Sequence, residues 1–258
     1  MKTFIAGGGF GDCILILNKF RQLAGPEDRM VYYLAEKQSN SRGIIEEFWE
    51  TQKVRYEIRM VPEISTPLSR YDRRDCRKLN PLVYGMGAIM VERWKFVFYP
   101  FDTFATPRME FEMNPSPYTE RYFVVQSDAG TMKYRGHKNW LNTGWIEDFI
   151  AGARAAGLKC VLLGTRDVGI KTADDRRFNI PLKDVFGILS RAEFVMGLQG
   201  FVTIAALFQG RRVLLKRENF RVILNYFHPR WYRQGKIFSE PRDWPASKTK
   251  ALLNWALA

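Results

Sequence analysis

A run of glycines that ends in an aspartate is the first part of this chain that could do chemistry. Gly7, Gly9 and Gly11 stand at alternate positions in AGGGFGDC, and Asp12 takes the place of the last glycine in a dinucleotide-binding G-x-G-x-x-G loop. A carboxylate there would lie against the pyrophosphate that such a loop binds, and it would repel that charge. The sequence therefore argues against a nicotinamide or flavin enzyme, and it contains no P-loop with Gly-Lys-Ser/Thr.

Asp12 itself has two interpretations. As a helix N-cap it accepts hydrogen bonds from backbone N–H groups and interacts favourably with the helix dipole. As a general base it takes a proton from a hydroxyl group, while the glycines let a substrate come close. A carboxyl group at a helix N-terminus stays ionised, which suits a base. Both interpretations remain open from the residues alone.

Short apolar stretches alternate with amphipathic ones in both halves of the chain, which predicts parallel sheets flanked by helices. The expected strands are residues 2–6, 29–35, 54–61, 122–126, 160–163, 194–196 and 212–215. The expected helices are residues 12–23, 41–52, 142–156, 182–190, 202–208 and the C-terminal tail. Gly157 is the expected C-cap of the helix that precedes it.

The sequence Asn-Pro-Ser-Pro at residues 114–117 can continue neither a helix nor a central strand, so we expect a linker there. It divides the chain into two α/β domains, residues 1–116 and 117–258. We expect these domains to face each other across a cleft, with ligands bound at the carboxyl ends of the strands. The final helix could pack back on the first domain.

The balance of charges points to a polyanionic partner. Lys and Arg number 40 against 27 Asp and Glu, which gives a net charge of +13. Such a field attracts nucleic acid, a phosphorylated glycan or an anionic membrane surface, although charge also serves solubility alone. The three cysteines are widely spaced and the two histidines lack ligand neighbours, so neither a disulfide framework nor a metal site is expected.

Neither a signal peptide nor an apolar stretch long enough to cross a bilayer is recognisable in the sequence. We therefore expect a cytoplasmic protein, and we expect it to be a monomer.

Three stretches resemble the lipopolysaccharide heptosyltransferases, which are two-domain glycosyltransferases of the GT-B type with two Rossmann-like domains. Residues 7–23 are similar to that family's opening G-x-G-D and apolar helix. Residues 126–167 are similar to its strand, K-x-W, helix and strand, with Lys138 and Trp140 at the K-x-W positions. Residues 182–215 are similar to its helix, strand, phosphate loop, helix and strand, but Gln199-Gly200 and then Thr203 replace the usual Asp-Ser/Thr-Gly and histidine.

The resemblance implies an inverting, metal-independent transfer from a nucleotide-sugar, for example a UDP-sugar. It places the catalytic base at Asp12, acceptor binding in the first domain and donor binding mainly in the second. An uncharged loop at a helix N-terminus can still offer backbone N–H groups to a diphosphate. Domain closure about residues 114–117 would exclude water. The expected donor-binding residues are Gly9, Gly11, Lys138, Gly164, Thr165, Gln199, Gly200 and Thr203.

Two basic stretches are expected to bind the acceptor, since cations interleaved with aromatic residues suit phosphates and exposed bases. Their residues are Arg70, Arg73, Arg74, Arg77, Lys78, Arg230 and Arg233. The interpretation that we favour from the sequence is a viral DNA-modifying enzyme that glycosylates 5-hydroxymethylcytosine in host cytoplasm. One alternative is an enzyme of lipopolysaccharide core synthesis. Another is a nucleic-acid-binding protein that has this scaffold and no catalytic activity.

Overall fold

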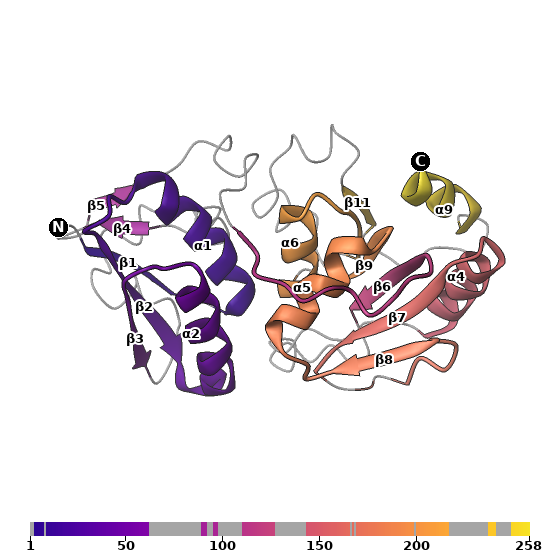
Figure 1. Ribbon diagram of the computed structural model, residues 1–258, viewed down its shortest axis with the longest axis horizontal. Helices are drawn as coiled ribbons and strands as arrows, with labels where there is room; N and C mark the ends of the chain where they lie inside the picture. Colours follow the sequence, from indigo (N-terminus) through magenta and orange to yellow (C-terminus); the bar gives the residue numbers. More distant parts are fainter. Residues whose placement is uncertain are drawn as a thin grey trace. The chain divides into compact units, whose positions relative to one another are not determined.

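The computed structural model describes residues 3–7, 9–61, 89–91, 95–97, 110–126, 143–165, 167, 169–198, 200–216, 237–240 and 249–258. These residues fall into two compact units, with the division between Glu110 and Phe111 (Figure 1). Each unit contains a β-sheet with helices packed on it. The predicted α/β class is therefore confirmed.

The first unit has a five-stranded sheet in the order β3-β2-β1-β4-β5. Its strands are β1 (Thr3–Gly7), β2 (Arg29–Ala35), β3 (Tyr56–Val61), β4 (Ile89–Val91) and β5 (Lys95–Val97). β1, β2 and β3 are parallel, whereas β4 runs antiparallel to both β1 and β5. The three strands predicted for this unit are therefore parallel as expected, and the antiparallel β4 and β5 lie where the sequence predicted no strand. A parallel pair needs a crossover of a dozen or more residues, and only residues 92–94 connect β4 to β5.

Helices α1 (Phe10–Leu23) and α2 (Arg42–Thr51) pack against each other in this unit, and the 3₁₀ helix η1 (Glu36–Ser41) precedes α2. The rings of Phe10 and Phe48 meet edge to face with their centroids 5.8 Å apart. Every residue from Cys13 to Leu17 is at most 1% exposed. The part of α1 that follows its first residues is therefore buried almost all round, which holds the helix in place on the sheet.

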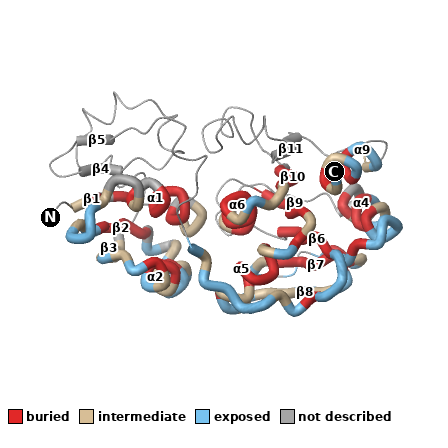
Figure 2. Tube along the Cα trace, turned by 45° about the horizontal axis from the view of Figure 1, so that its top comes forward, coloured by how far each residue is buried: buried red, intermediate tan, exposed pale blue. Residues whose placement is uncertain are grey.

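The second unit has a six-stranded sheet, entirely parallel, in the order β11-β10-β9-β6-β7-β8. Its strands are β6 (Tyr122–Gln126), β7 (Lys159–Gly164), β8 (Asp175–Phe178), β9 (Phe194–Leu198), β10 (Arg212–Lys216) and β11 (Ile237–Glu240). All residues of β6 and β9 are buried (Figure 2). Strands covered on both faces read as continuous apolar runs, which is why YFVVQ and FVMGL could be recognised from the sequence.

Helices cover both faces of this sheet. They are α4 (Thr143–Ala155), α5 (Leu182–Arg191), α6 (Phe201–Phe208) and α9 (Thr249–Leu257). Phe123 and Val125 share a core with α4 and α9, whereas Tyr122 and Gln126, at alternate positions of the same strand, face α5 and α6. Gly157 follows α4 with φ +79°, as expected of its C-cap.

The final helix packs on the second unit. Leu252, Leu253 and Ala256 of α9 belong to the apolar core that α4 also covers. Ala258 follows directly. The apolar face of α9 is therefore buried within the second unit.

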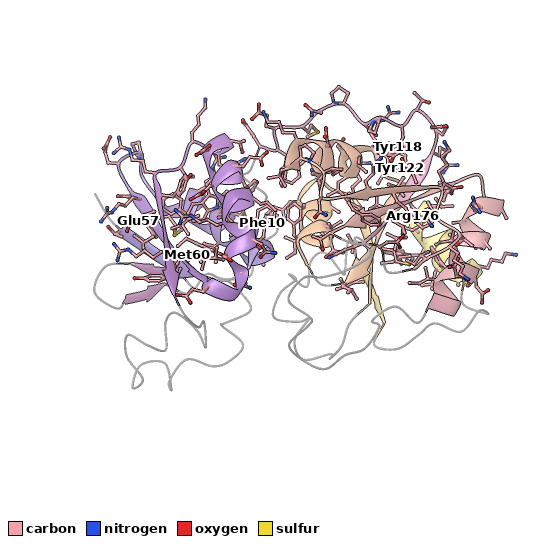
Figure 3. All side chains as sticks on the ribbon, turned by 90° about the horizontal axis from the view of Figure 1, so that it is seen from below. Phe10, Glu57, Met60, Tyr118, Tyr122 and Arg176 are labelled. Carbon is pink, nitrogen blue, oxygen red and sulfur yellow. The ribbon has the colours of Figure 1, made fainter. Side chains whose placement is uncertain are left out.

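The predicted linker is bound along the surface of α5. Asn114 donates from its backbone N–H to Lys183 O (3.2 Å) and from Nδ2 to Asp184 (2.7 Å), and Lys183 pairs with Glu112 (2.8 Å). Further along, the rings of Tyr118 and Tyr122 lie 4.7 Å apart (Figure 3). Because of these contacts residues 111–116 belong to the second unit, and the boundary lies before the proline pair instead of within it.

Candidate active site

The glycine loop leads from β1 directly into α1. The carbonyl of Gly9 accepts the backbone N–H of Cys13 at 3.1 Å, which closes the first turn of the helix. α1 begins at Phe10, so Asp12 is its third residue and not its N-cap. The prediction that the helix starts at Asp12 is thus wrong by two residues. A carboxyl group in the first turn of a helix interacts favourably with the helix dipole. The backbone of Asp12 lies just beyond the carboxyl end of β1.

Two buried aromatic residues hold this turn, and neither was singled out from the sequence. The Tyr32 hydroxyl, from β2, donates to Gly9 O at 3.0 Å. The Trp49 indole N–H, from α2, donates to Cys13 Sγ at 2.5 Å. Both side chains are fully buried. Aromatic residues in strands and helices usually indicate a core, so only the three-dimensional structure reveals that these two reach the glycine loop with their polar atoms.

The expected phosphate loop joins β9 to α6 in the second unit. Gly200 is the N-cap of α6, and its backbone N–H donates to Thr203 Oγ1 at 3.1 Å. The Thr203 hydroxyl donates in turn to Leu198 O at 2.8 Å. Thr203 is fully buried, so its hydroxyl serves to shape the turn. The groups of this turn that could bind an anionic ligand are the backbone N–H groups at the start of α6.

Gln126, at the carboxyl end of β6, fills the space beneath this turn. A Cβ atom on Gly197 would lie 2.6 Å from Gln126 Cβ, and a Cβ atom on Gly200 would lie 2.9 Å from Gln126 Nε2. Gln126 is only 3% exposed. Glycine is therefore required at position 197, where the contact is with Cβ of the glutamine, whereas a side chain at position 200 would need the end of the Gln126 side chain to shift. The sequence marked Gln126 only as the end of an apolar strand.

Gly164 and Thr165 lie at the carboxyl end of β7, beside β6. Asn179, just after β8, donates its backbone N–H to Gly164 O (3.1 Å) and its Nδ2 to Thr165 O (2.9 Å). Asn179 adopts φ +51°, a left-handed conformation that asparagine tolerates better than most residues. Since all strands of this sheet are parallel, Gln126, Gly164, Thr165 and Gly200 share one edge of it.

The structure places the predicted site residues in two groups. Gly9, Gly11 and the backbone of Asp12 lie together in the first unit, and Gly164, Thr165, Gly200 and Thr203 lie together in the second. The predicted residues outside the described part are Lys138, Gln199, Arg70, Arg73, Arg74, Arg77, Lys78, Arg230 and Arg233.

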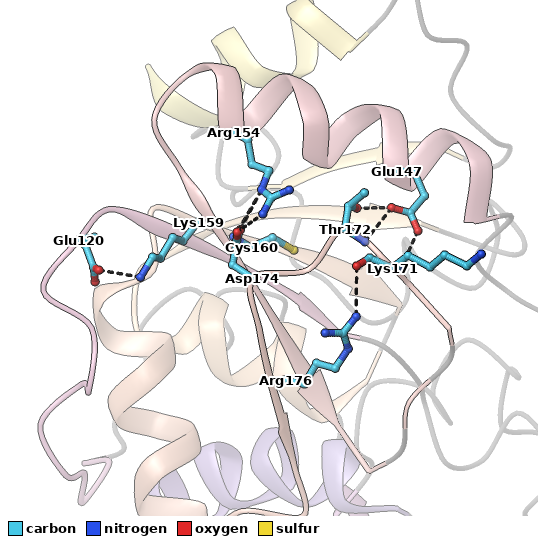
Figure 4. A network of polar contacts seen from close by, with 9 residues as sticks. All are labelled: Glu120, Glu147, Arg154, Lys159, Cys160, Lys171, Thr172, Asp174 and Arg176. Carbon is cyan, nitrogen blue, oxygen red and sulfur yellow. Dashed lines mark hydrogen bonds and ion pairs between the residues drawn. The ribbon is translucent and has the colours of Figure 1, made fainter.

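The carboxyl groups with clearly shifted pKa values lie away from this edge. Burial alone would raise the pKa of Asp174, but hydrogen bonds from Arg154 and from the Cys160 N–H, with the Arg154 charge, hold it below its ordinary value. Figure 4 shows this network, in which Glu147 also binds Lys171 N (2.7 Å) and the hydroxyl of Thr172. Cys160 lies near the amino end of β7 and Asp174 directly precedes β8, so these contacts stabilise the fold at the sheet edge opposite to the candidate site.

Within the described ranges, no group of three or more His, Cys, Asp or Glu residues is placed to hold a metal ion. Cys13 and Cys160 are buried free thiols. No described helix is both long and apolar enough to cross a membrane.

The sequence matches no protein-family model and no curated protein. Solved structures do match its fold. The Escherichia coli ADP-heptose lipopolysaccharide heptosyltransferase II is 10% identical, with a TM-score of 0.58 over 100% of this chain and 98% of that one. The E. coli heptosyltransferase WaaC, solved with ADP, is 12% identical, with a TM-score of 0.55 over 98% of both chains.

A third match is partial. The dodecameric iron-containing heptosyltransferase TibC, solved with ADP-D-β-D-heptose, is 16% identical with a TM-score of 0.48, and the match covers 84% of this chain. The chain spans only 58% of the length of TibC. The two full-length matches show that this chain has the fold of the heptosyltransferases, which is the GT-B fold that the sequence predicts.

Proposed function

We propose that this protein is a glycosyltransferase that moves a sugar from a nucleotide-sugar to a hydroxyl group of a phosphorylated glycan. One observation carries the proposal: Asp12 stands in the first turn of α1, directly after a glycine loop, in a chain that matches heptosyltransferases over its whole length. The backbone of Asp12 thus lies at the carboxyl edge of a sheet, where open α/β folds bind their ligands.

We propose Asp12 as the general base. Its carboxylate takes the proton from the acceptor hydroxyl, and the freed oxygen attacks the anomeric carbon of the donor. The bond from that carbon to the diphosphate breaks, and the nucleoside diphosphate leaves with the electron pair. Backbone N–H groups at the start of α6 and the ammonium group of Lys138 would stabilise the charge that develops on the diphosphate.

An ADP-sugar is the donor that we propose, in place of the UDP-sugar suggested by the sequence. The names of the two full-length matches include ADP-heptose in one case and ADP in the other. The same comparison favours a lipopolysaccharide core over hydroxymethylated DNA as the acceptor, since one match is a lipopolysaccharide heptosyltransferase and none of the matches described above is named as a DNA-modifying enzyme. The charge of +13 suits a phosphorylated core equally well.

The test is a transfer assay with mass spectrometry of the products. ADP-heptose and UDP-glucose would each be offered with heptose-free lipopolysaccharide core and with duplex DNA that contains 5-hydroxymethylcytosine. We expect ADP-heptose, and not UDP-glucose, to add the mass of one sugar to the lipopolysaccharide core, and we expect neither donor to modify the DNA. Asp12→Asn should lower the rate by about 10²- to 10⁴-fold, since a general base contributes that much, and should keep ADP binding.

Asp28→Asn is the matched control, because Asp28 is also in the first unit and accepts the Gly25 N–H in the loop after α1 (2.9 Å). It should retain full activity. A sugar on the DNA would overturn the proposed acceptor. Transfer that survives in Asp12→Asn would overturn the role of Asp12, and a protein that binds no nucleotide-sugar would overturn the function itself.

A further inference from the structure

The carbonyl of Gly9 is held from two sides. It accepts the backbone N–H of Cys13 at 3.1 Å, from within α1, and the hydroxyl of Tyr32 at 3.0 Å, from β2. Tyr32 is fully buried, and its ring meets that of Trp49 edge to face, 5.1 Å between centroids. A buried hydroxyl that donates to a specific carbonyl fixes the peptide plane of that carbonyl, because any rotation would leave the hydroxyl without its acceptor.

The next buried contact falls four residues further on. The indole N–H of Trp49 donates to Cys13 Sγ at 2.5 Å, and both residues are completely buried. Gly9 and Cys13 are the two ends of the first hydrogen-bonded turn of α1, and Asp12 lies between them. The backbone that carries Asp12 is therefore anchored at both ends by polar atoms of the core aromatic residues Tyr32 and Trp49.

We propose that Tyr32 is a positioning residue for Asp12, acting through the carbonyl of Gly9. This inference rests on the proposed function, because it assumes that Asp12 is the base. A base must lie within hydrogen-bonding reach of the proton that it takes, and a displacement of about 1 Å can reduce the rate by about 10²-fold. A hydroxyl in the core that sets the first turn of α1 controls that distance without touching the substrate.

The test is Tyr32→Phe, which removes the hydroxyl and keeps the ring that packs on Trp49. We expect kcat with ADP-heptose and heptose-free core to fall by about tenfold, because the base is displaced. KM for ADP-heptose should stay within about twofold, because the donor-binding groups that we propose belong to the second unit, whereas Tyr32 belongs to β2 of the first. Amide hydrogen exchange in a peptide that spans residues 9–17 should become faster, since the first turn opens more readily.

Tyr122→Phe is the matched control. The Tyr122 hydroxyl is likewise buried and donates to a backbone carbonyl, that of Ile188, at 2.6 Å, but it belongs to β6 of the second unit. Both variants should lose a similar amount of stability. Only Tyr32→Phe should lose kcat and gain exchange in residues 9–17.

The outcomes separate the inference from the function on which it rests. If wild-type protein transfers sugar but Tyr32→Phe keeps its kcat, or leaves exchange in residues 9–17 unchanged, the inference is wrong and the function stands. Equal losses of kcat in Tyr32→Phe and Tyr122→Phe would also overturn it, because they would reflect stability alone. If the wild-type protein transfers no sugar, the function fails, and Tyr32 has no base to position.

Discussion

The carbonyl oxygen of Asn114 lies where a side chain on Gly187 would begin: a Cβ atom at position 187 would be 2.1 Å from it. Gly187 is on α5, and Asn114 is in the extended segment that precedes β6. Backbone cannot yield as the end of a flexible side chain can. The glycine is therefore what allows residues 111–116 to lie directly on α5.

Gly187→Ala should push this segment away from α5 and lower the free energy of unfolding by about 1–3 kcal/mol, the usual cost of overpacking. Urea unfolding would measure it. Gly43→Ala is the control, because Gly43 is in α2 and its Cβ would have nothing within 4 Å. That variant should be neutral or stabilising by up to about 1 kcal/mol, as alanine is the better helix former. Equal effects at both sites would contradict the close packing at Gly187.

The same contact explains why the linker was misplaced from the sequence. The Asn-Pro-Ser-Pro motif rules out helix and central strand, and the segment is indeed neither. The motif cannot reveal that Asn114 bonds to Lys183 and Asp184, nearly seventy residues later, because those contacts depend on tertiary packing. Buried parallel strands are easier to predict from the sequence than such contacts. The strands β2 and β6 have the bounds that their apolar runs predict.

The site was predictable in the same uneven way. The strand–helix turns that contain Gly200 and Asp12 could be located because glycines and an acid at strand–helix junctions have a local pattern. Tyr32 and Gln126 could not be singled out, because in the sequence an aromatic residue or an amide in a buried strand looks the same whether or not it contacts one of these turns. The strands β4, β5, β8 and β11 are three or four residues long, too short for alternation to stand out.

Gly200 and Gln126 should be energetically coupled. A methyl group on Gly200 would meet Gln126 Nε2 at 2.9 Å, so Gly200→Ala should be destabilising while the glutamine is present. In a Gln126→Ala background the obstacle is gone, and the cost of Gly200→Ala should shrink. Urea unfolding of the four proteins forms a double-mutant cycle, with an expected coupling of about 0.5–3 kcal/mol. Additivity within about 0.5 kcal/mol would show that the two residues do not constrain each other.

The Thr203 hydroxyl should be needed for the stability of the turn before α6. Thr203→Val keeps the shape but leaves Leu198 O without the hydroxyl donor that lies 2.8 Å away, at a cost of about 1–3 kcal/mol. Thr203→Ser keeps the hydroxyl and loses one methyl group, a cost of about 1 kcal/mol. Thermal unfolding should thus rank wild type above Ser and Ser above Val, and ADP affinity should follow the same order. If the Thr203→Val protein were as stable as the wild type, a structural role for the hydroxyl would be excluded.

The stability of the protein at acid pH should depend on Asp174. Burial raises the pKa of this carboxyl, but the hydrogen bonds from Arg154 and the Cys160 N–H outweigh burial, and the net pKa lies below the ordinary value of 3.8. Folding therefore favours the ionised form, so the stabilisation is present at neutral pH and is lost as the pH falls below about 4 towards the pKa of the folded state.

Asp174→Asn should destabilise the protein at pH 7, where the contact with Arg154 is lost, and its effect should shrink as the pH falls towards the lowered pKa of the folded state and the wild-type carboxyl takes up a proton. Arg154 is about half exposed (47%), so part of the effect should disappear in 1 M salt. The control is Asp148→Asn, an exposed residue on the same helix as Arg154. Urea unfolding from pH 2 to 7 would measure the difference. A difference between Asp174→Asn and wild type that stays constant across this range would mean that the folded state does not favour the charge on Asp174.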